Sequence, residues 1–564
     1  MLTLLASLLL AAPVPARAAS RPETGFLVLA PDRGFLGNAE TRDAFDAYRG
    51  RFKAALALLG PRGAAAELDA ARASLRRQGA GEVVVLPLFV SENSPFLLDA
   101  KARLGAEAGV LFAACFGRHP YALEALQDRA AALSRDPRRE RLVLVAQGAD
   151  GPESARRMEA DLLAAAAGLD ARVPFASKAA VVLEGWDPLR DFSGRSDARL
   201  RGALQDAARA GLKPVLVPFD LTVKMDSMMR LANRLGAAAA GAAAFDGADL
   251  SPHPALAAWL SRESYRRLPA REEDLGLVFM PHGFDEAWNR LMLDSVAPLA
   301  ARVPLEPAFG MADPALIERA IRRLEARGVR RIAVVRAYSL DSSFRAETEA
   351  VLGLASSAAP APEHAHHGHV MGPHAMAAPR AILSSSDLVT LGGIGDSPLF
   401  AGALYDRVRE LSRAPSAETV FLVAHGAQDD AENALWQKTL DSLASQVREL
   451  SIRAGSPFRA VVGATLREDW PETRGPAVAA LREQVQKAAA SGRAIVVPAR
   501  TAEGGPEREL LTGLDFAYAG TSFAPHPNFL RWVQSQEAEA LKLLESRRRE
   551  GLTPSHQPST LGAP

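Results

Sequence analysis

The sequence predicts an α/β protein built from four related units, each a parallel sheet with helices on both faces. Four apolar runs each end in a polar turn, and each is followed by a helical pattern of spaced Ala, Leu and Met. Every unit then holds a second buried run. Apolar runs that alternate with helices are typical of buried parallel strands. The opening runs are Gly25–Asp32, Arg141–Asp150, Leu275–Asp285 and Val420–Asp429, and the later runs are Glu82–Val90, Lys213–Asp220, Arg331–Tyr338 and Arg493–Ala499.

The four units fall into two alternating kinds, which indicates a tandem duplication of a two-unit gene. Unit one matches unit three, and unit two matches unit four. The matched segments are Gly117–Arg129 with Gly395–Arg407, Ser251–Leu260 with Ala524–Val533, and Leu183–Pro188 with Leu466–Pro471. We therefore expect the units to associate as two pairs.

The alignment of the halves also locates an insertion and the unit boundaries. Pro87 matches Arg336, but the offset has grown where Asp128 matches Asp406, so extra residues entered unit three between these marks. The Ala/Pro/Gly/His-rich stretch 355–379 lies there and has no helix or strand period, which predicts a loop. The expected divisions are a signal peptide (1–18), units at 19–136, 137–270, 271–415 and 416–549, and a disordered tail (550–564).

Composition excludes several classes of function. Lys+Arg and Asp+Glu are both 66, so no basic excess exists for binding nucleic acid. The single cysteine, Cys115, excludes a disulfide framework, a cysteine-ligated zinc site and an iron–sulfur site. Any bound metal must therefore use His, Asp, Glu or Met.

The N-terminus predicts export. Leu2–Ala12 is an apolar run of signal-peptide length, and Ala16–Ala18 has the small-x-small form of a cleavage site. The expected location is periplasmic or secreted. A cytoplasmic protein with a misplaced start or a lipophilic N-terminal tail is the alternative. No later run is long enough for a membrane helix, so we expect no membrane span.

Two short motifs connect the sequence to a known family. His282-Gly283 is followed by an acidic residue and by Asn289, and His425-Gly426 is followed by acidic residues and by Asn433. Together with Val303–Arg331, these motifs resemble the class II chelatases, the sirohydrochlorin cobaltochelatase and ferrochelatase family, over nearly the whole mature chain. Some long members of that family carry a His-rich insertion after the third strand, as this chain does.

The resemblance implies a fold, a reaction and a site. The implied fold is a flavodoxin-like three-layer sheet, with two units facing each other across a cleft. The implied reaction is that of a lyase of cobalamin or siroheme biosynthesis, which inserts Co²⁺ or Fe²⁺ into a sirohydrochlorin-type tetrapyrrole. Cobalt, iron or nickel would be a substrate, with no organic cofactor. His282 and His425 stand where the family keeps its metal ligand.

The sequence also departs from the family's pattern. No second His follows the third strand in the matching stretches Ser91–Phe96, Ser339–Phe344 and Thr501–Pro506. Met311 replaces an acidic residue, while Asp32 and Gln147 replace the first His in units one and two. We therefore expect any activity in units three and four, with units one and two as scaffold.

The chemistry of metal insertion suits these candidates. Removing two pyrrole protons needs a base, and the metal needs a ligand that releases it, and neutral imidazole serves both needs. We expect His282 and His425 as catalytic groups and metal ligands, oriented by Asp285, Asp429 or Glu432. The plainer alternative is that each His is hydrogen-bonded within a strand–helix turn.

Other residues were assigned from their surroundings. A His-rich tract comprises His364, His366, His367, His369 and His374. We expect it to bind a transition metal, and the alternative is that it is a low-complexity insert without a function. His119, His253 and His526 each precede Pro at a helix start and are expected to be structural. Glu184 and Glu468 end matching strands and are interpreted as surface carboxylates rather than cleft acids. Cys115 is expected to be buried, and Met225, Met228 and Met229 to pack a helix.

Two hypotheses of function follow, with a third as the limiting case. The first is a chelatase that acts on a tetrapyrrole. The second is a non-catalytic exported protein that binds metal or tetrapyrrole on a chelatase scaffold. The export signal favours the second, and the intact His-Gly motifs favour the first. A structural relic that binds no metal is the third.

Overall fold

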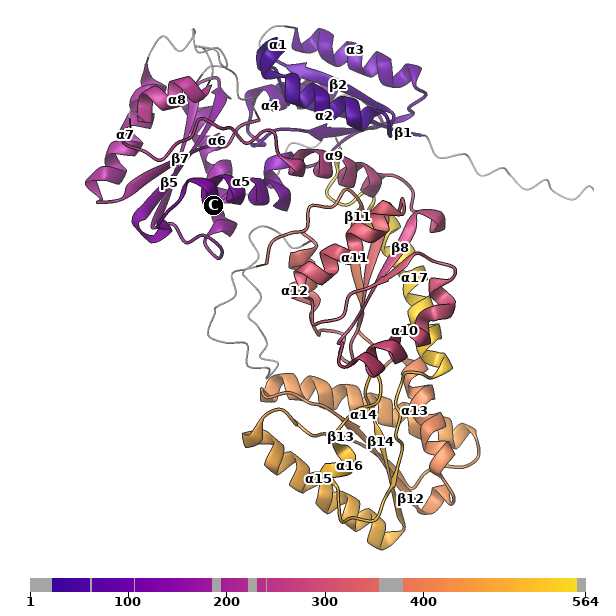
Figure 1. The fold of residues 1–564 in the computed structure, drawn as a ribbon. Helices are drawn as coiled ribbons and strands as arrows, with labels where there is room; N and C mark the ends of the chain where they lie inside the picture. The colour runs from indigo at the N-terminus through magenta and orange to yellow at the C-terminus, as the bar shows by residue number, and fades with distance from the viewer. Residues whose placement is uncertain are drawn as a thin grey trace, which may run out of the picture.

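The computed structural model describes residues 23–60, 63–105, 107–184, 194–221, 231–239, 241–354 and 379–554. The expected signal peptide (1–18), the five histidines of the tract and the Met225–Met229 cluster lie outside the described residues. Figure 1 shows four sheet-centred units along the chain. The predicted α/β fold is confirmed.

Units one and two form the N-terminal half, and the first strand is fully buried in unit one and mostly buried in unit two. The strands and helices of unit one are β1 (Thr24–Pro31), α1 (Gly34–Gly37), α2 (Ala39–Arg49), β2 (Ala54–Leu59), α3 (Ala64–Arg77), β3 (Glu82–Pro87), α4 (Pro95–Leu104), β4 (Val110–Phe112), η1 (Phe116–Arg118) and α5 (Pro120–Leu133). Those of unit two are η2 (Pro137–Arg139), β5 (Glu140–Ala149), α6 (Pro152–Ala165), η3 (Ala167–Leu169), β6 (Ser177–Glu184), α7 (Arg195–Arg209), β7 (Lys213–Pro218), α8 (Leu231–Ala239) and α9 (Pro254–Arg267).

Units three and four repeat this order in the C-terminal half. Unit three contains η4 (Glu272–Asp274), β8 (Leu275–Pro281), α10 (Glu286–Ala300), β9 (Leu305–Pro307), α11 (Pro314–Ala326), β10 (Arg331–Ala337), α12 (Arg345–Val351), β11 (Asp387–Gly392) and α13 (Pro398–Leu411). Unit four contains η5 (Pro415–Ala417), β12 (Glu418–Ala424), α14 (Asp430–Arg453), β13 (Ala460–Thr465), α15 (Pro471–Ser491), β14 (Arg493–Pro498), α16 (Glu507–Leu510), β15 (Ala517–Tyr518) and α17 (Pro527–Arg547), and β16 (Thr553–Pro554) follows it.

All four sheets have one strand order. The first strand of each unit lies between its second and third strands, as in β13-β12-β14-β15, β2-β1-β3-β4 and β9-β8-β10-β11. In unit two the fourth position is a single bridge, Val215 with Ala244. These neighbours pair in parallel. The carboxyl ends of the central strands therefore meet at one edge, where open α/β sheets bind ligands.

The units associate as two pairs, because each pair shares one hydrophobic core. One cluster joins Phe26 and Tyr121 of unit one with Leu144 and Trp259 of unit two. A second joins Phe279 of unit three with residues of unit four. The last helix of each unit covers its partner, since α13 packs on α14 and α17 packs on β11. A unit separated from its partner would therefore lose the partner's helix that packs against it.

The three histidines before proline cap helices, as expected. His119, His253 and His526 precede α5, α9 and α17, and each accepts a hydrogen bond through Nδ1 from the backbone N–H two residues later, at 3.1, 3.2 and 3.1 Å. The second ring nitrogen makes an equivalent contact in the two halves, as the duplication predicts. His253 Nε2 lies 3.2 Å from Asp128, and His526 Nε2 lies 3.3 Å from Asp406.

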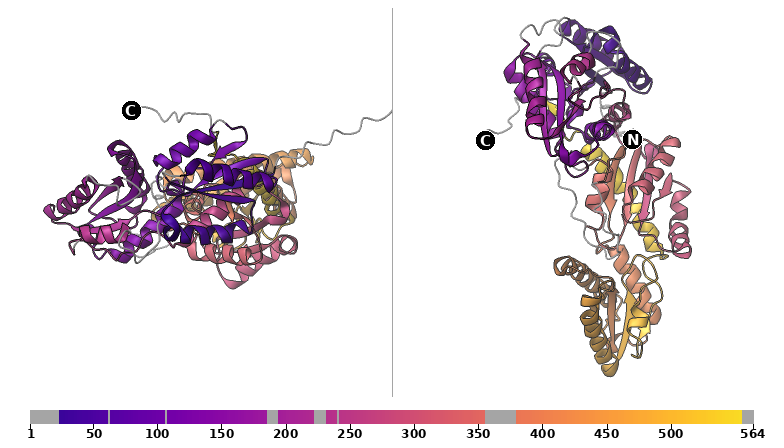
Figure 2. Two further views of the ribbon diagram at one scale, coloured as in Figure 1. Left: turned by 90° about the horizontal axis from the view of Figure 1, so that it is seen from above. Right: turned by 60° about the vertical axis from the view of Figure 1, so that its left-hand side comes forward.

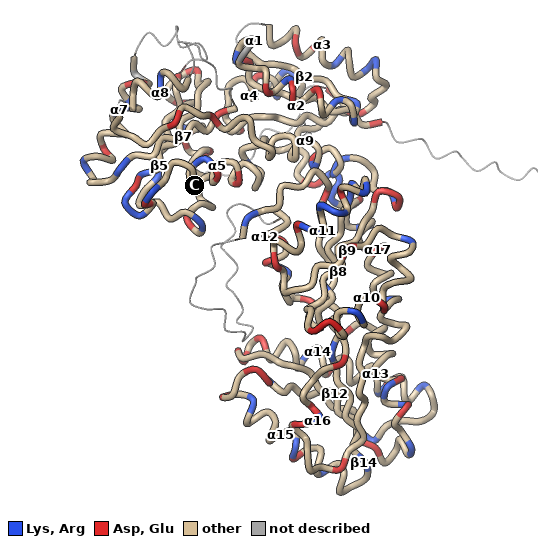
Figure 3. Tube along the Cα trace, viewed as in Figure 1, with Lys and Arg blue, Asp and Glu red and all other residues tan. Residues whose placement is uncertain are grey.

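The N-terminal half meets one end of the C-terminal half (Figure 2), and Lys and Arg residues gather along the chain at this junction (Figure 3). Arg331 donates hydrogen bonds to the carbonyl oxygens of Tyr265, Leu268 and Pro269. Arg262 donates to the Leu352 carbonyl and to the Tyr121 hydroxyl, which itself donates to unit three. These contacts satisfy buried polar groups across the junction, so the two halves are held together by more than the connecting chain.

Part of the segment expected to be a disordered tail is ordered. Thr553–Pro554 form β16, which pairs antiparallel with β4 of unit one. Nearby, the guanidinium of Arg267 donates to the carbonyl oxygens of Arg548 and Glu550. The short polar segment lacks its own core, and pairing with a distant sheet edge is what orders it, which local composition does not reveal.

Glu263 gives the junction a pH-dependent stability. Burial opposes its charge, but Arg267, at 2.9 Å, and Arg266 lower its pKa from 4.5 to about 2. The unfolded chain therefore binds more protons between these values, so the contribution is complete above pH 4.5 and is lost as the pH falls toward 2. We expect Glu263→Gln to cost about 3 kcal/mol of unfolding free energy at pH 7 and progressively less below pH 4.5. Urea unfolding of both proteins at several pH values tests this, and a pH-independent difference would contradict it.

Among the described helices, we find none that combines the length and apolar character required to cross a bilayer.

Candidate functional site in the cleft between units three and four

The strand–helix turns after β8 and β12 are built by the His-Gly…Asn motif. In unit four, Gly426 has φ +81°, and a Cβ there would lie 2.7 Å from Asn433 Oδ1. That oxygen accepts a hydrogen bond from the N–H of Ala427 at 3.1 Å. In unit three, Asn289 accepts from the N–H of Phe284 at 2.9 Å. The glycine and asparagine thus close the turn and leave the preceding histidine at the end of the strand.

His425 is part of a compact group of ligand atoms. Its Nε2 lies 2.9 Å from Asp469 Oδ2 and 4.0 Å from Glu468 Oε1. The three ligand atoms all lie within 4.8 Å of one another. Both carboxylates follow β13, which pairs with β12. Two adjacent strand ends therefore bring one imidazole and two carboxylates together, a donor set that suits a divalent transition metal.

The environment of His425 favours its protonated form. Burial disfavours the charge, but the hydrogen bond to Asp469, the charge of Glu468 and the Gly426 carbonyl together raise the pKa of His425 above its ordinary value. Nδ1 lies 2.7 Å from that carbonyl, so Nδ1 donates there and Nε2 faces the carboxylates. A bound metal would take the place of the Nε2 proton. The imidazole then has one fixed nitrogen and one exchangeable nitrogen, as a proton acceptor requires.

These groups line a cleft of about 340 Å³ between units three and four. Its walls include the aromatic rings of Tyr338, Phe344 and Trp436, and the Trp436 ring centroid lies 6.3 Å from that of His425. Trp288 reaches across from unit three and donates to the Glu503 carbonyl at 3.2 Å. His282 lines the same cleft. The cleft therefore joins a metal-ligand group to flat apolar surfaces that suit a conjugated ring.

The predicted site residues have different surroundings. His282 and His425 share the cleft, but His282 is exposed, with Nδ1 2.6 Å from the Gly283 carbonyl. Asp285 and Asp429 are the N-caps of α10 and α14. Glu432 is near enough for His425 to lower its pKa, yet burial and Asp429 raise it overall. A role for these acids in orienting the imidazoles stays a prediction.

The interpretation of Glu468 as a surface carboxylate was wrong. Its side chain is 14% exposed, and it lines the cleft together with Arg500. Sequence reasoning also missed Asp469 as the partner of His425. Its signal was the matched pair Leu183–Pro188 and Leu466–Pro471, which placed charged residues after a buried strand. Cys115 is buried as predicted, and burial raises the pKa of its thiol well above the ordinary value.

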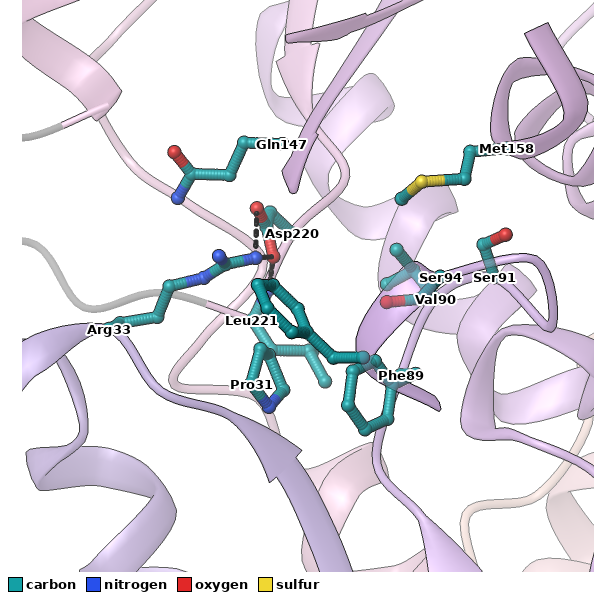
Figure 4. Close-up of a pocket in the computed structure, with 11 residues that line it drawn as sticks. Pro31, Arg33, Phe89, Val90, Ser91, Ser94, Gln147, Met158, Asp220 and Leu221 are labelled. Carbon is teal, nitrogen blue, oxygen red and sulfur yellow. Dashed lines mark hydrogen bonds and ion pairs between the residues drawn. The ribbon is translucent and has the colours of Figure 1, made fainter. Parts of the chain in front are cut away.

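At the corresponding strand ends of units one and two, the described residues leave little space between the units (Figure 4). Its cavity has a volume of about 10 Å³, roughly enough for one water molecule. Arg33 of unit one donates from Nη2 to both carboxylate oxygens of Asp220 in unit two, at 2.9 Å each. Asp32, at the position of His282, instead accepts from Asn38 at 2.7 Å. Gln147, at the position of His425, lines the remaining cavity.

Comparisons with known proteins give structural matches. No protein-family model matches the sequence, and no curated protein matches it. SirB from Bacillus subtilis with Fe³⁺ is 16% identical and covers 48% of this chain and 98% of its own, with a TM-score of 0.34. The sirohydrochlorin chelatase SirB from Bacillus subtilis subspecies spizizenii, in complex with cobalt, is 15% identical and covers 48% and 97%, with a TM-score of 0.32.

A third match is larger than the part that aligns. DR2241 from Deinococcus radiodurans is described as a multi-domain protein with structural similarity to chelatases and two additional novel domains. It is 16% identical and covers 47% of this chain, with a TM-score of 0.29, and this chain spans 55% of its length. The chain is thus structurally similar to SirB sirohydrochlorin chelatases over about half of its length.

Proposed function

We propose that the cleft between units three and four binds a divalent transition metal, cobalt or iron, and inserts it into a tetrapyrrole of the sirohydrochlorin type. The observation that carries this is the group formed by His425, Glu468 and Asp469, whose ligand atoms lie within 4.8 Å of one another beside aromatic walls. The sequence resemblance to class II chelatases supports the same reaction. Metal and tetrapyrrole are both substrates in this proposal.

Each group has a part in this scheme. The two carboxylates attract the cation, and His425 Nε2 becomes its nitrogen ligand. The tetrapyrrole lies against the aromatic walls and presents its pyrrole nitrogens to the metal. As metal passes to the ring, His425 is free to accept one of the two pyrrole protons, because its raised pKa makes the imidazole a stronger base than usual, and the second proton leaves to solvent. Asp469, hydrogen-bonded to Nε2, then stabilises the imidazolium.

The second candidate is an exported protein that holds metal or tetrapyrrole without catalysis. The observation that favours it is that Arg500, rather than a second histidine, follows β14 at the floor of the cleft. The signal-peptide pattern at 1–18 supports the same alternative, and we propose a periplasmic or secreted location, with the cytoplasm as the alternative. In both candidates the His-rich tract supplies additional transition-metal binding.

One experiment separates these readings. Co²⁺ and sirohydrochlorin are mixed with the full chain, and insertion is followed by absorbance against a protein-free control. We expect a rate above the spontaneous one. The same assay is run on a tract variant in which His364, His366, His367, His369 and His374 are all alanine, and we expect fewer bound Co²⁺ ions but retained insertion. A spontaneous rate with bound Co²⁺ supports the binding protein, and no bound Co²⁺ contradicts both candidates.

A further inference from the structure

Arg500 holds the outer carboxylate of the proposed metal site. It follows β14 by two residues, and its side chain is 15% exposed. Nη1 donates to Glu468 Oε1 at 3.0 Å, and Nη2 donates to Glu468 Oε2. Both oxygens of Glu468 are thus bound by one guanidinium, in the bidentate geometry that arginine forms with carboxylates.

A second carboxylate fixes Arg500 from behind. Its Nε donates to Glu507 Oε1 at 2.6 Å, and Glu507 is fully buried. The hydroxyl of Tyr518 donates to Glu507 Oε2 at 3.3 Å. Because Glu507 compensates the arginine's charge, Arg500 stays in place when Glu468 turns toward another cation.

Arg500 therefore competes with a metal ion for Glu468. His425 Nε2 lies 2.9 Å from Asp469 Oδ2 but 4.0 Å from Glu468 Oε1, so Glu468 is displaced toward the arginine. A metal ion that binds Glu468 must either share this carboxylate with the guanidinium of Arg500 or draw it away from the guanidinium.

We propose that Arg500 regulates this site as a resident counter-cation, weakening the hold on the metal and reclaiming Glu468 when the metal leaves. The inference rests on the proposed function, because it concerns the same ligand group. A protein that transfers metal must release it, so a weaker third ligand favours turnover over storage. Arg500 is a positioning residue in this scheme, acting through Glu468.

The equivalent position in unit two supports the importance of this charge. Asp220 follows β7 by two residues, as Arg500 follows β14. There the charge is reversed, and Asp220 is bound by Arg33 of the facing unit. Where the strand-end charge pairs across the two units, the described residues leave only a cavity of about 10 Å³. In unit four Arg500 pairs with Glu468 and Glu507 of its own unit, and the cleft is open.

The test removes the charge of Arg500 without leaving the buried Glu507 carboxylate unpaired. Arg500→Met combined with Glu507→Gln removes the buried pair and leaves Glu468 free. Arg493→Met with Glu418→Gln is the matched control, because Arg493 begins the same strand and pairs with another fully buried glutamate at 3.1 Å. Arg500→Lys keeps the charge. All variants are made in the full chain of the tract variant, so that Co²⁺ reports on the cleft.

The measurements are the Co²⁺ dissociation constant by calorimetry and the d–d absorption of the bound ion. We expect the Arg500/Glu507 double variant to bind Co²⁺ at least about tenfold more tightly. We also expect an altered d–d spectrum, since Glu468 is no longer shared with Arg500 and binds the ion more strongly. Arg500→Lys should stay within about threefold of the parent affinity, and the Arg493/Glu418 control should match it.

Failure of the inference can be distinguished from failure of the proposed function. A parent protein that binds Co²⁺, with unchanged or weaker affinity in a folded double variant, contradicts the role of Arg500 alone. A thermal transition like that of the Arg493/Glu418 control shows that the variant is folded. A parent protein that binds no Co²⁺ contradicts the metal site itself.

Discussion

Replacing His425 by alanine should lower the rate of Co²⁺ insertion by about 10²–10⁴-fold, the usual cost of removing a general base. His425 is the only nitrogen ligand in the described three-residue ligand group, and its raised pKa makes it the better proton acceptor. The measurement is the initial rate by absorbance, at several Co²⁺ concentrations, so that loss of metal affinity is separated from loss of the base.

Two other histidines provide the controls for this prediction. His282→Ala should have a smaller effect, because His282 is exposed and does not belong to the described ligand group. His526→Asn keeps a helix cap outside the cleft and should leave the rate unchanged. If the His425, His282 and double variants all keep the full rate over background, the assigned site is wrong.

Replacing Asp220 by alanine should destabilise the protein by about 3–5 kcal/mol, because it leaves a buried guanidinium without its partner. The side chains of Arg33 and Asp220 are 7% and 3% exposed, and their ion pair joins unit one to unit two. Among the residues that the structure describes, Nε and Nη1 of Arg33 find no hydrogen-bond partner. The measurement is the free energy of urea unfolding, followed by circular dichroism.

Matched variants show whether the loss comes from a stranded charge. Arg33→Met with Asp220→Leu removes both charges and should restore most of the stability, since apolar pairs of similar volume often replace buried ion pairs without loss. Glu449→Ala removes an exposed pair with Arg453 and should change stability by about 0.5 kcal/mol or less. Equal losses in Asp220→Ala and the double variant would contradict the account.

The repeat and the strands could be predicted because both depend on residues that are close together in the sequence. Buried parallel strands are continuous apolar runs, so the runs Leu275–Asp285 and Val420–Asp429, which hold β8 and most of β12, could be predicted without tertiary information. The caps at His253 and His526 were equally local, since a residue before proline avoids helical geometry. The exchange of α13 and α17 between units was not, because it depends on which apolar face meets which sheet.

The site was predicted only in part for the same reason. His425 belongs to a motif, and its position at a strand end follows from that motif. Its partners follow a strand that is adjacent in space but distant in sequence, so the residues around His425 do not indicate that Asp469 is its partner. The small cavity of the first pair could not be predicted either, because Arg33 and Asp220 are far apart along the chain and only the fold brings them together.

The central claim is that His425, Glu468 and Asp469 hold a divalent metal in the cleft between units three and four. Anomalous diffraction at the cobalt edge, from crystals of the full chain grown with Co²⁺, tests it most directly. The account predicts an anomalous peak within about 2.0–2.2 Å of His425 Nε2 and of a carboxylate oxygen of Asp469. An empty cleft in crystals whose cobalt lies elsewhere on the chain would contradict it.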